Sequence, residues 1–176
     1  MNIQQPGPHL DHMLKQTREH HVALSSMADL KANILMTLSS VVLTLSVRYV
    51  ETPRSRAAAL ILIFFCLLTM VFAVYTVMPK VSLLIRRRGK PDVRDPNFNL
   101  LFFSDYLQLD YGEYVKAMEV MMNDPSRSYE MQLRELYTLG RFLARKKYRF
   151  VQLAYLAFLT GVFASGVIML VSGLLR

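Results

Sequence analysis

Four histidines near the N-terminus are the first candidates for chemistry, because imidazole serves both as a metal ligand and as an acid–base catalyst near neutral pH. They are His9, His12, His20 and His21. His9 and His12 share a helix face, but two imidazoles on one turn fall short of the four ligands that a zinc site usually has. The sequence also lacks a Gly-rich phosphate loop, a His-Glu-x-x-His motif and a Gly-x-Ser-x-Gly motif. We therefore expect no metal and no other cofactor, and we expect that the chain is not an enzyme.

A second candidate is the Asp29-Leu30-Lys31-Ala32 segment, which precedes an apolar stretch. Asp29 and Lys31 lie about 200° apart on a helix, so they pair poorly with each other. An ionisable side chain on a packed surface at the membrane boundary is costly unless it is paired or solvated. Lys31 therefore needs either a carboxylate from another helix or an anionic ligand. The alternative is that Lys31 extends to lipid phosphates while Asp29 faces water.

Three apolar blocks position these residues, and we interpret each as a membrane span; the alternative for the first block is a buried or re-entrant helix. About 20 apolar residues cross the ~30 Å of hydrocarbon in a bilayer. Residues 57–78 and 150–175 carry no charge, whereas residues 32–47 form a shorter block that Lys31 and Arg48 can extend from its ends. We expect six segments: a cytoplasmic N-terminal helix (1–31), a first span (32–50), an extracytoplasmic turn (51–56), a second span (57–79), a basic cytoplasmic helical insert (80–149) and a third span (150–175).

The charge distribution predicts the orientation in the membrane. The net charge is +8, from 21 Lys and Arg against 13 Asp and Glu, and fourteen of the 21 lie between Lys80 and Arg149. Because positively charged segments stay in the cytoplasm, the N-terminus and residues 80–149 are expected there. The cluster Arg86, Arg87 and Arg88 follows the second span closely, where it can bind anionic lipid headgroups.

A heptad pattern predicts that the N-terminal helix runs unbroken into the first span. Residues spaced alternately by four and three form one continuous packing seam. They are Leu10, Leu14, Thr17, His21, Leu24, Ala28, Lys31, Leu35, Leu38, Val42 and Leu45. His21 on this seam is expected to be a packed, neutral imidazole.

The insert is also expected to be helical. Residues 91–98 contain two prolines and predict a loop, and Ser104 or Asp105 can cap a helix that runs to Met121. Asp124 followed by Pro125 is a start signal for the next helix, in which Glu130 and Arg134 are spaced to pair. Because no strong helix breaker follows, this helix should continue into the third span as one rod of roughly 45–50 residues, about 70 Å long. No strand pattern appears, so the predicted fold is an all-α membrane bundle.

The third span carries Ala157, Gly161 and Ser165 at four-residue spacing. Small residues in this array let helices approach closely in a bilayer. We expect them to mediate either a tight contact within the chain or oligomerisation.

Short motifs along nearly the whole chain resemble the Pycsar transmembrane effector family. The order of two spans, a helical insert and a final span is similar as well. The motifs are Asp29-x-Lys31-Ala32, Phe102-Phe103, Glu113-Tyr114, Asp124, Gln132 and Lys147-Tyr148.

The resemblance implies a bacterial antiphage effector in the inner membrane that senses cyclic CMP or cyclic UMP and impairs the membrane, so that growth stops or the cell dies. It implies a homo-oligomer that contacts membrane lipid and a cyclic nucleotide, and no nucleic acid. Lys31, Arg145 or Lys147 would pair with the cyclic phosphate, and Phe103, Tyr114 or Tyr148 would stack on the base. Asp29 would belong to the same site. The alternative function is a non-enzymatic structural or scaffold subunit of a membrane complex.

Overall fold

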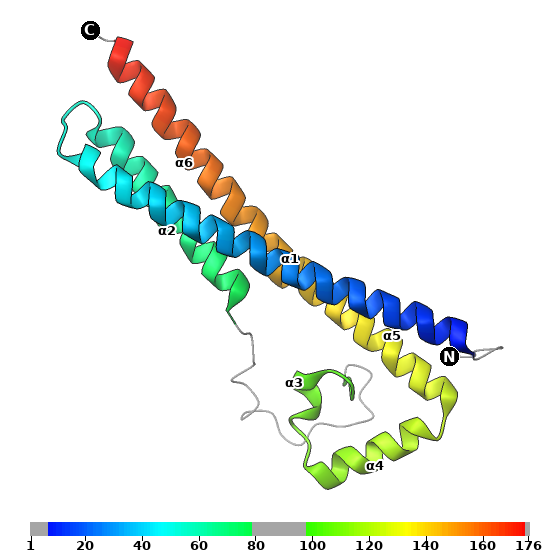
Figure 1. Ribbon diagram of the computed structural model, residues 1–176. Helices are drawn as coiled ribbons and strands as arrows, with labels where there is room; N and C mark the ends of the chain where they lie inside the picture. Colours follow the sequence, from blue (N-terminus) through cyan, green and yellow to red (C-terminus); the bar gives the residue numbers. More distant parts are fainter. Residues whose placement is uncertain (1–6, 79–97, 175–176) are drawn as a thin grey trace. The chain divides into compact units, whose positions relative to one another are not determined.

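A computed structural model describes residues 7–78 and 98–174 (Figure 1). Every regular element within these ranges is a helix, as predicted. The chain divides into two compact units, one formed by residues 1–23 and 79–142 and the other by residues 24–78 and 143–176. The basic cluster Arg86, Arg87 and Arg88 and most of the predicted loop 91–98 lie outside the described residues.

Helix α1 (Pro8–Val47) is the continuous helix that the heptad pattern predicted. Its apolar half contains hydroxyl side chains, and four of them donate to the carbonyl oxygen four residues earlier, at 2.6–3.1 Å. These internal bonds satisfy groups that hydrocarbon would leave without a partner. The four are Thr37, Ser40, Thr44 and Ser46.

The packed face of α1 differs from the predicted seam after Ala28. Ala32, Leu35 and Ser39 are buried, whereas Leu38 and Leu45 are 47% and 59% exposed. Lys31 is also exposed, so its assignment to the packed seam was wrong. Inside a bilayer, large apolar side chains do not drive helices together, because lipid is equally apolar. Small residues lie between the helices instead, since they allow the backbones to approach closely. The face therefore follows Ala28, Ala32, Leu35, Ser39 and Ser46.

Helices α2 (Arg56–Val77) and α6 (Arg149–Leu174) complete the membrane unit. A short 3₁₀ turn, η1 (Arg48–Val50), leads from α1 towards α2, and the Ser55 hydroxyl closes the connection by donating to the Tyr49 carbonyl at 2.9 Å. Among the described residues, three helices are long and apolar enough to cross a membrane: Pro8–Val50, Arg56–Val77 and the rod Pro125–Leu174. The predicted bundle with three membrane spans is confirmed.

Small residues bring α6 close to α2. A Cβ atom added at Gly161 would lie 2.4 Å from the Cβ of Phe65, so only glycine fits this crossing. Ala157 is buried one turn earlier, and Ser165 is half-buried one turn later. Gly161 thus makes a tight contact with Phe65 of α2, whereas oligomerisation through Ala157, Gly161 and Ser165 stays a prediction.

The described part of the other unit contains three more helices: α3 (Phe103–Tyr106), α4 (Tyr111–Met122) and α5 (Pro125–Phe142). The single helix predicted from Ser104 or Asp105 to Met121 is wrong, because a turn separates α3 from α4. This turn lets Leu109 pack on a small apolar core of Phe98, Leu100 and Met121. Asp105 does not cap a helix through its side chain; its carboxylate accepts from the Asn99 N–H at 3.0 Å.

The start of α5 follows the predicted signal. The Asp124 carboxylate accepts the backbone N–H of Ser126 at 3.0 Å, which satisfies a donor that the first helical turn leaves free. Arg134 pairs with Glu130 at 3.0 Å, as its spacing predicted, and also donates to the Phe98 carbonyl at 3.2 Å. The helix then continues into α6 through η3 (Leu143–Tyr148), a π-helical segment that the sequence pattern did not predict.

Candidate functional site

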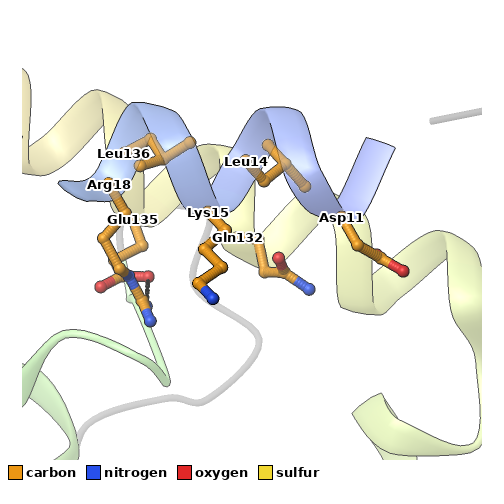
Figure 2. Close-up of a pocket in the computed structure, with 7 residues that line it drawn as sticks. All are labelled: Asp11, Leu14, Lys15, Arg18, Gln132, Glu135 and Leu136. Atoms are coloured by element: carbon orange, nitrogen blue, oxygen red, sulfur yellow. Dashed lines mark hydrogen bonds and ion pairs between the residues drawn. The ribbon is translucent and has the colours of Figure 1, made fainter. Parts of the chain in front are cut away.

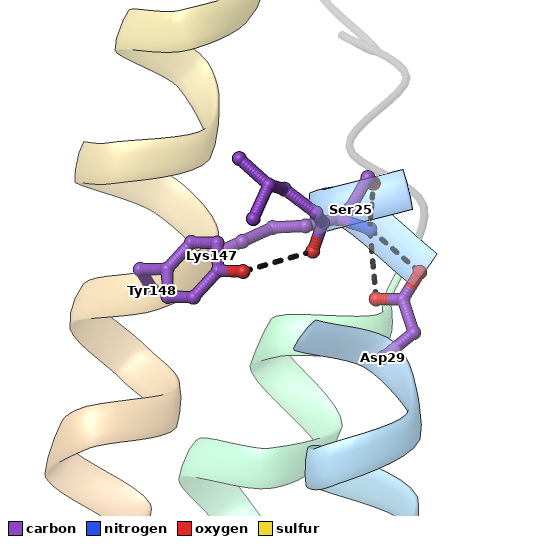
Figure 3. Close-up of polar contacts among 5 residues, drawn as sticks. Ser25, Asp29, Lys147 and Tyr148 are labelled. Atoms are coloured by element: carbon purple, nitrogen blue, oxygen red, sulfur yellow. Dashed lines mark hydrogen bonds and ion pairs between the residues drawn. The ribbon is translucent and has the colours of Figure 1, made fainter. Parts of the chain in front are cut away.

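The π-helical segment η3 carries two of the predicted site residues, Lys147 and Tyr148. A π-helix bonds each N–H to the carbonyl five residues back, so its turns are wider and consecutive side chains point in more similar directions than on an α-helix. As a result, both side chains reach the same stretch of α1 (Figure 3). Such segments occur often at functional sites, where they present side chains that a regular helix would separate.

The Lys147 ammonium group bridges two residues of α1. It lies 2.7 Å from both carboxylate oxygens of Asp29 and 2.8 Å from the Ser25 hydroxyl (Figure 3). The Lys147 side chain is 13% exposed and that of Asp29 is 35% exposed. An ammonium group has three N–H donors, and three acceptor atoms surround this one. The charge of Lys147 is therefore neutralised within the chain.

Tyr148 adds a second link to the same helix. Its hydroxyl donates to the Leu24 carbonyl at 3.1 Å. We call Leu24, Ser25, Asp29, Lys147 and Tyr148 the polar cluster. It lies where the apolar spans of α1 and α6 begin, so it fixes the two helices against each other at one end of the membrane unit.

The other predicted ligand-binding residues lie elsewhere. Lys31 and Arg145 are exposed and take no part in the polar cluster. Phe103 and Tyr114 belong to the other unit, where each contacts a different ring. Phe103 lies beside Phe102 with ring centroids 5.4 Å apart, and Tyr114 lies beside Tyr106 at 5.3 Å. Tyr114 also packs against the apolar core of its unit, whereas Phe103 is 44% exposed.

A charged pocket of about 130 Å³ lies between α1 and α5 in the first unit (Figure 2). Its apolar base is formed by Leu14 and Leu136, which are both buried. Arg18 pairs with Glu135 across the pocket. The complete lining is Asp11, Leu14, Lys15, Arg18, Gln132, Glu135 and Leu136.

One edge of this pocket is held by a tyrosine. The buried Tyr129 hydroxyl donates to the Asp11 carboxylate at 2.8 Å, and this hydrogen bond, together with burial, raises the pKa of Tyr129 above its ordinary value. The bond ties the start of α1 to α5, and Tyr129 packs with Leu10, Leu14 and Leu136. The pocket therefore has a fixed wall on its apolar side.

Sequence reasoning missed the pocket residues as a site. Gln132 was noted only for its resemblance to the family, and Asp11, Lys15, Arg18 and Glu135 were not considered as site residues. The available signal was their spacing: Asp11, Lys15 and Arg18 follow one another at four and three residues, and Gln132 precedes Glu135 by three residues and Leu136 by four. The spacing shows a shared face on each helix but not that the two faces meet.

The histidines do not assemble a metal site in the described part of the chain, where no three of His, Cys, Asp and Glu come together. His21 packs its ring over Gly140, where an added Cβ would lie 3.5 Å from the imidazole Cε1. Its Nδ1 is buried without a partner among the described residues. This placement agrees with a packed imidazole.

The long apolar helices define a helical membrane protein, and two of these helices begin in polar sequence before their apolar spans. The model of the Pycsar effector protein domain matches residues 12–174 of the 176-residue chain. The chain belongs to this family of effectors, which suggests a role in antiphage defence. No match was found among curated proteins or among solved structures.

Proposed function

We propose that this protein is a membrane effector of bacterial antiphage defence that senses a cyclic pyrimidine nucleotide, cyclic CMP or cyclic UMP, through its cytoplasmic helices. In response it impairs the integrity of the inner membrane, so that the infected cell stops growing or dies. The match to the Pycsar effector domain over residues 12–174 carries the proposal. No catalytic step is assigned to the chain.

The charge distribution supports the proposed orientation. With the N-terminus and residues 80–149 in the cytoplasm, most Lys and Arg side chains face the side on which positive charge is retained. The same side has anionic lipid headgroups and is where a nucleotide made during infection would be found. An anionic signal would therefore meet the basic face of the protein.

Continuous helices offer a physical route from ligand to membrane. Helix α1 contains pocket residues near its start and a membrane span near its end, and the rod Pro125–Leu174 has the same order from start to end. A ligand that binds one arrangement of these helices more tightly than another shifts the protein towards it. The polar cluster is where such a shift would alter the packing of the spans.

Self-association is part of the proposal. A single narrow bundle cannot enclose a wide aqueous path, and α6 exposes large apolar side chains, including Phe163 at 70% and Leu170 at 68%. These can face lipid or a second copy. Chemical cross-linking in membranes, with and without nucleotide, would show whether the number of subunits changes.

A vesicle assay tests the proposed activity. The full chain is reconstituted into lipid vesicles loaded with a self-quenching dye, and cyclic CMP or cyclic UMP is added from outside, where it meets the molecules whose soluble unit faces outward. We expect dye release with at least one cyclic pyrimidine nucleotide and none with cyclic AMP, cyclic GMP or protein-free vesicles. If no nucleotide causes release and none binds, the proposal is wrong, and a structural subunit becomes the better description.

A further inference from the structure

The two charged sites of the protein differ in how accessible their cations are. In the polar cluster, the Lys147 donors are all engaged and its side chain is 13% exposed. In the pocket, the Arg18 side chain is 49% exposed and that of Lys15 is 73% exposed. An anion can approach the pocket cations from solvent, whereas it would have to displace Asp29 to reach Lys147.

We propose that the pocket between α1 and α5 is the nucleotide-binding site, in which the ligand phosphate replaces Glu135 as the partner of Arg18 and Gln132 hydrogen-bonds the base. The inference rests on the proposed function and places its ligand against residues that, apart from Gln132, no sequence motif marked. It also makes Glu135 an internal competitor of the ligand.

Arg18 is suited to hold a phosphate. Its guanidinium has five N–H donors in a planar fork, and this geometry matches two oxygens of a phosphate as well as those of a carboxylate. Glu135 occupies part of this fork in the free protein. Lys15, which lies three residues earlier on the same face of α1, can supply a second positive charge (Figure 2).

Gln132 is suited to the base. Its amide offers two donors and an acceptor, and it can rotate so that either end faces the ligand. Cytosine and uracil each present carbonyl acceptors and N–H donors on one edge, so one glutamine side chain can bond either of them. Leu14 and Leu136 provide the apolar surface that a base or sugar would contact.

The pocket size predicts how the ligand would sit. A volume of about 130 Å³ is below the ~300–1,000 Å³ of pockets that enclose a whole drug-sized ligand. The nucleotide would be held at one edge and remain partly exposed to solvent. It could therefore bind without prior opening of the unit, and replacement of the Arg18–Glu135 pair would be the step that couples binding to α1 and α5.

Calorimetric titration of the detergent-solubilised full chain with cyclic CMP and cyclic UMP tests the inference. We expect Arg18→Ala to weaken binding about tenfold or more, because a hydrogen bond to a charged group contributes about 1.5–3 kcal/mol. Arg18→Lys should retain part of the affinity, since it keeps the charge and loses the fork.

Gln132→Glu should weaken binding through repulsion, and Glu135→Gln should strengthen it by removing the competitor. Lys116→Ala, a change of an exposed cation on α4, is the matched control and should bind like the unmodified protein.

The outcomes separate this inference from the proposed function. If the unmodified protein binds a cyclic pyrimidine nucleotide but Arg18→Ala, Arg18→Lys and Glu135→Gln all bind it equally well, the nucleotide site lies elsewhere while the sensing function stands. If Glu135→Gln weakens binding as much as Arg18→Ala, the pair has a structural role and the competition is refuted. If the unmodified protein binds no cyclic nucleotide, the proposed function fails and the inference fails with it.

Discussion

The ammonium nitrogen of Lys147 lies 2.7 Å from each carboxylate oxygen of Asp29, although the two residues are 118 positions apart in the sequence. The pair joins the second half of α1 to η3, the π-helical segment that precedes α6. It is also the contact at which a predicted ligand cation, Lys147, meets a carboxylate of its own chain. The first two predictions follow from this pairing.

Breaking the pair should destabilise the membrane unit. We expect Lys147→Met to lower the free energy of unfolding by about 1–2 kcal/mol, because Asp29 is partly exposed and can be solvated. Asp29→Asn should cost more, since it leaves a charge on the more buried partner. Thermal unfolding in detergent measures both, with Arg145→Met as the control on an exposed cation of the same segment. Similar losses in all three variants would show that the pair has no specific role.

Breaking the Lys147–Asp29 pair should also affect the growth of cells that express the protein. If the polar cluster holds the resting arrangement of the spans, expression of Lys147→Met should be toxic in the absence of any nucleotide signal, while Arg145→Met should not be. Growth curves and a membrane-potential dye in uninfected cells give the readout. Healthy growth with normal expression of Lys147→Met would show that the cluster does not restrain the protein.

The π-helical segment can be tested by deleting one residue. Removing the exposed Ala144 lets residues 143–148 return to α-helical bonding while the register of α6 is kept, because a π-turn contains one extra residue. We expect a protein that still folds but no longer releases dye in the vesicle assay. Deleting Thr138 from the regular part of α5 is the control, and it should destabilise the protein because nothing absorbs the lost residue. A Δ144 variant with normal activity would mean that the wide turn is incidental.

The crossing of α2 and α6 should not tolerate side chains at Gly161. Gly161→Leu forces atoms into the space of Phe65, and overpacking of this kind costs about 1–3 kcal/mol. Phe65→Ala should recover part of that loss in the double variant. Gly166→Ala is the matched control, since an added Cβ there meets nothing within 4 Å, and it should leave the melting temperature unchanged or higher. Equal effects at both glycines would contradict the close crossing.

The Tyr129–Asp11 hydrogen bond should give a pH-dependent contribution to stability. Because the pKa of Tyr129 is raised above its ordinary 10.0 in the folded protein, the protonated phenol is favoured by folding. Its contribution is therefore complete below pH 10.0 and is lost as the pH rises through the raised folded pKa. Tyr129→Phe should be less stable than the unmodified protein at neutral pH, and the two stabilities should converge at high pH. Tyr137→Phe, at an exposed position of α5, is the control; a constant difference for Tyr129→Phe at every pH would refute this account.

Much of the fold could be predicted because its signals are local. The apolar blocks give the three spans, and Asp124-Pro125 gives the start of α5. Because no strong helix breaker intervenes, the sequence also predicts two helices that each continue from a polar segment into an apolar one. The packed face of α1 was predicted from its large apolar residues. The observed face is shifted by one residue from that prediction, to Ala32, Ser39 and Ser46. The shift occurs because burying Leu38 and Leu45 gives no advantage in hydrocarbon.

The sites were less accessible to sequence reasoning because they depend on contacts between distant residues. Asp29, Lys147 and Tyr148 were selected individually, but nothing local shows that Asp29 neutralises Lys147. The pocket needs Arg18 to meet Glu135, 117 residues away. The π-helical segment likewise has no marker in Leu143–Tyr148, where the residues have ordinary helix propensities.

A wide turn of this kind also changes how the junction before the last span can move. Because the extra residue is held by neighbouring backbone bonds, it can pass along the helix one position at a time, with each step exchanging one hydrogen bond for another. Each step turns only the residue that it passes, by about 100°, and leaves the helix on either side in place. The close crossing of Gly161 and Phe65 is therefore kept while Lys147 or Tyr148 turns towards or away from α1. Residues 143–148 thus form an adjustable joint that can loosen the grip on α1 without rotating the third span.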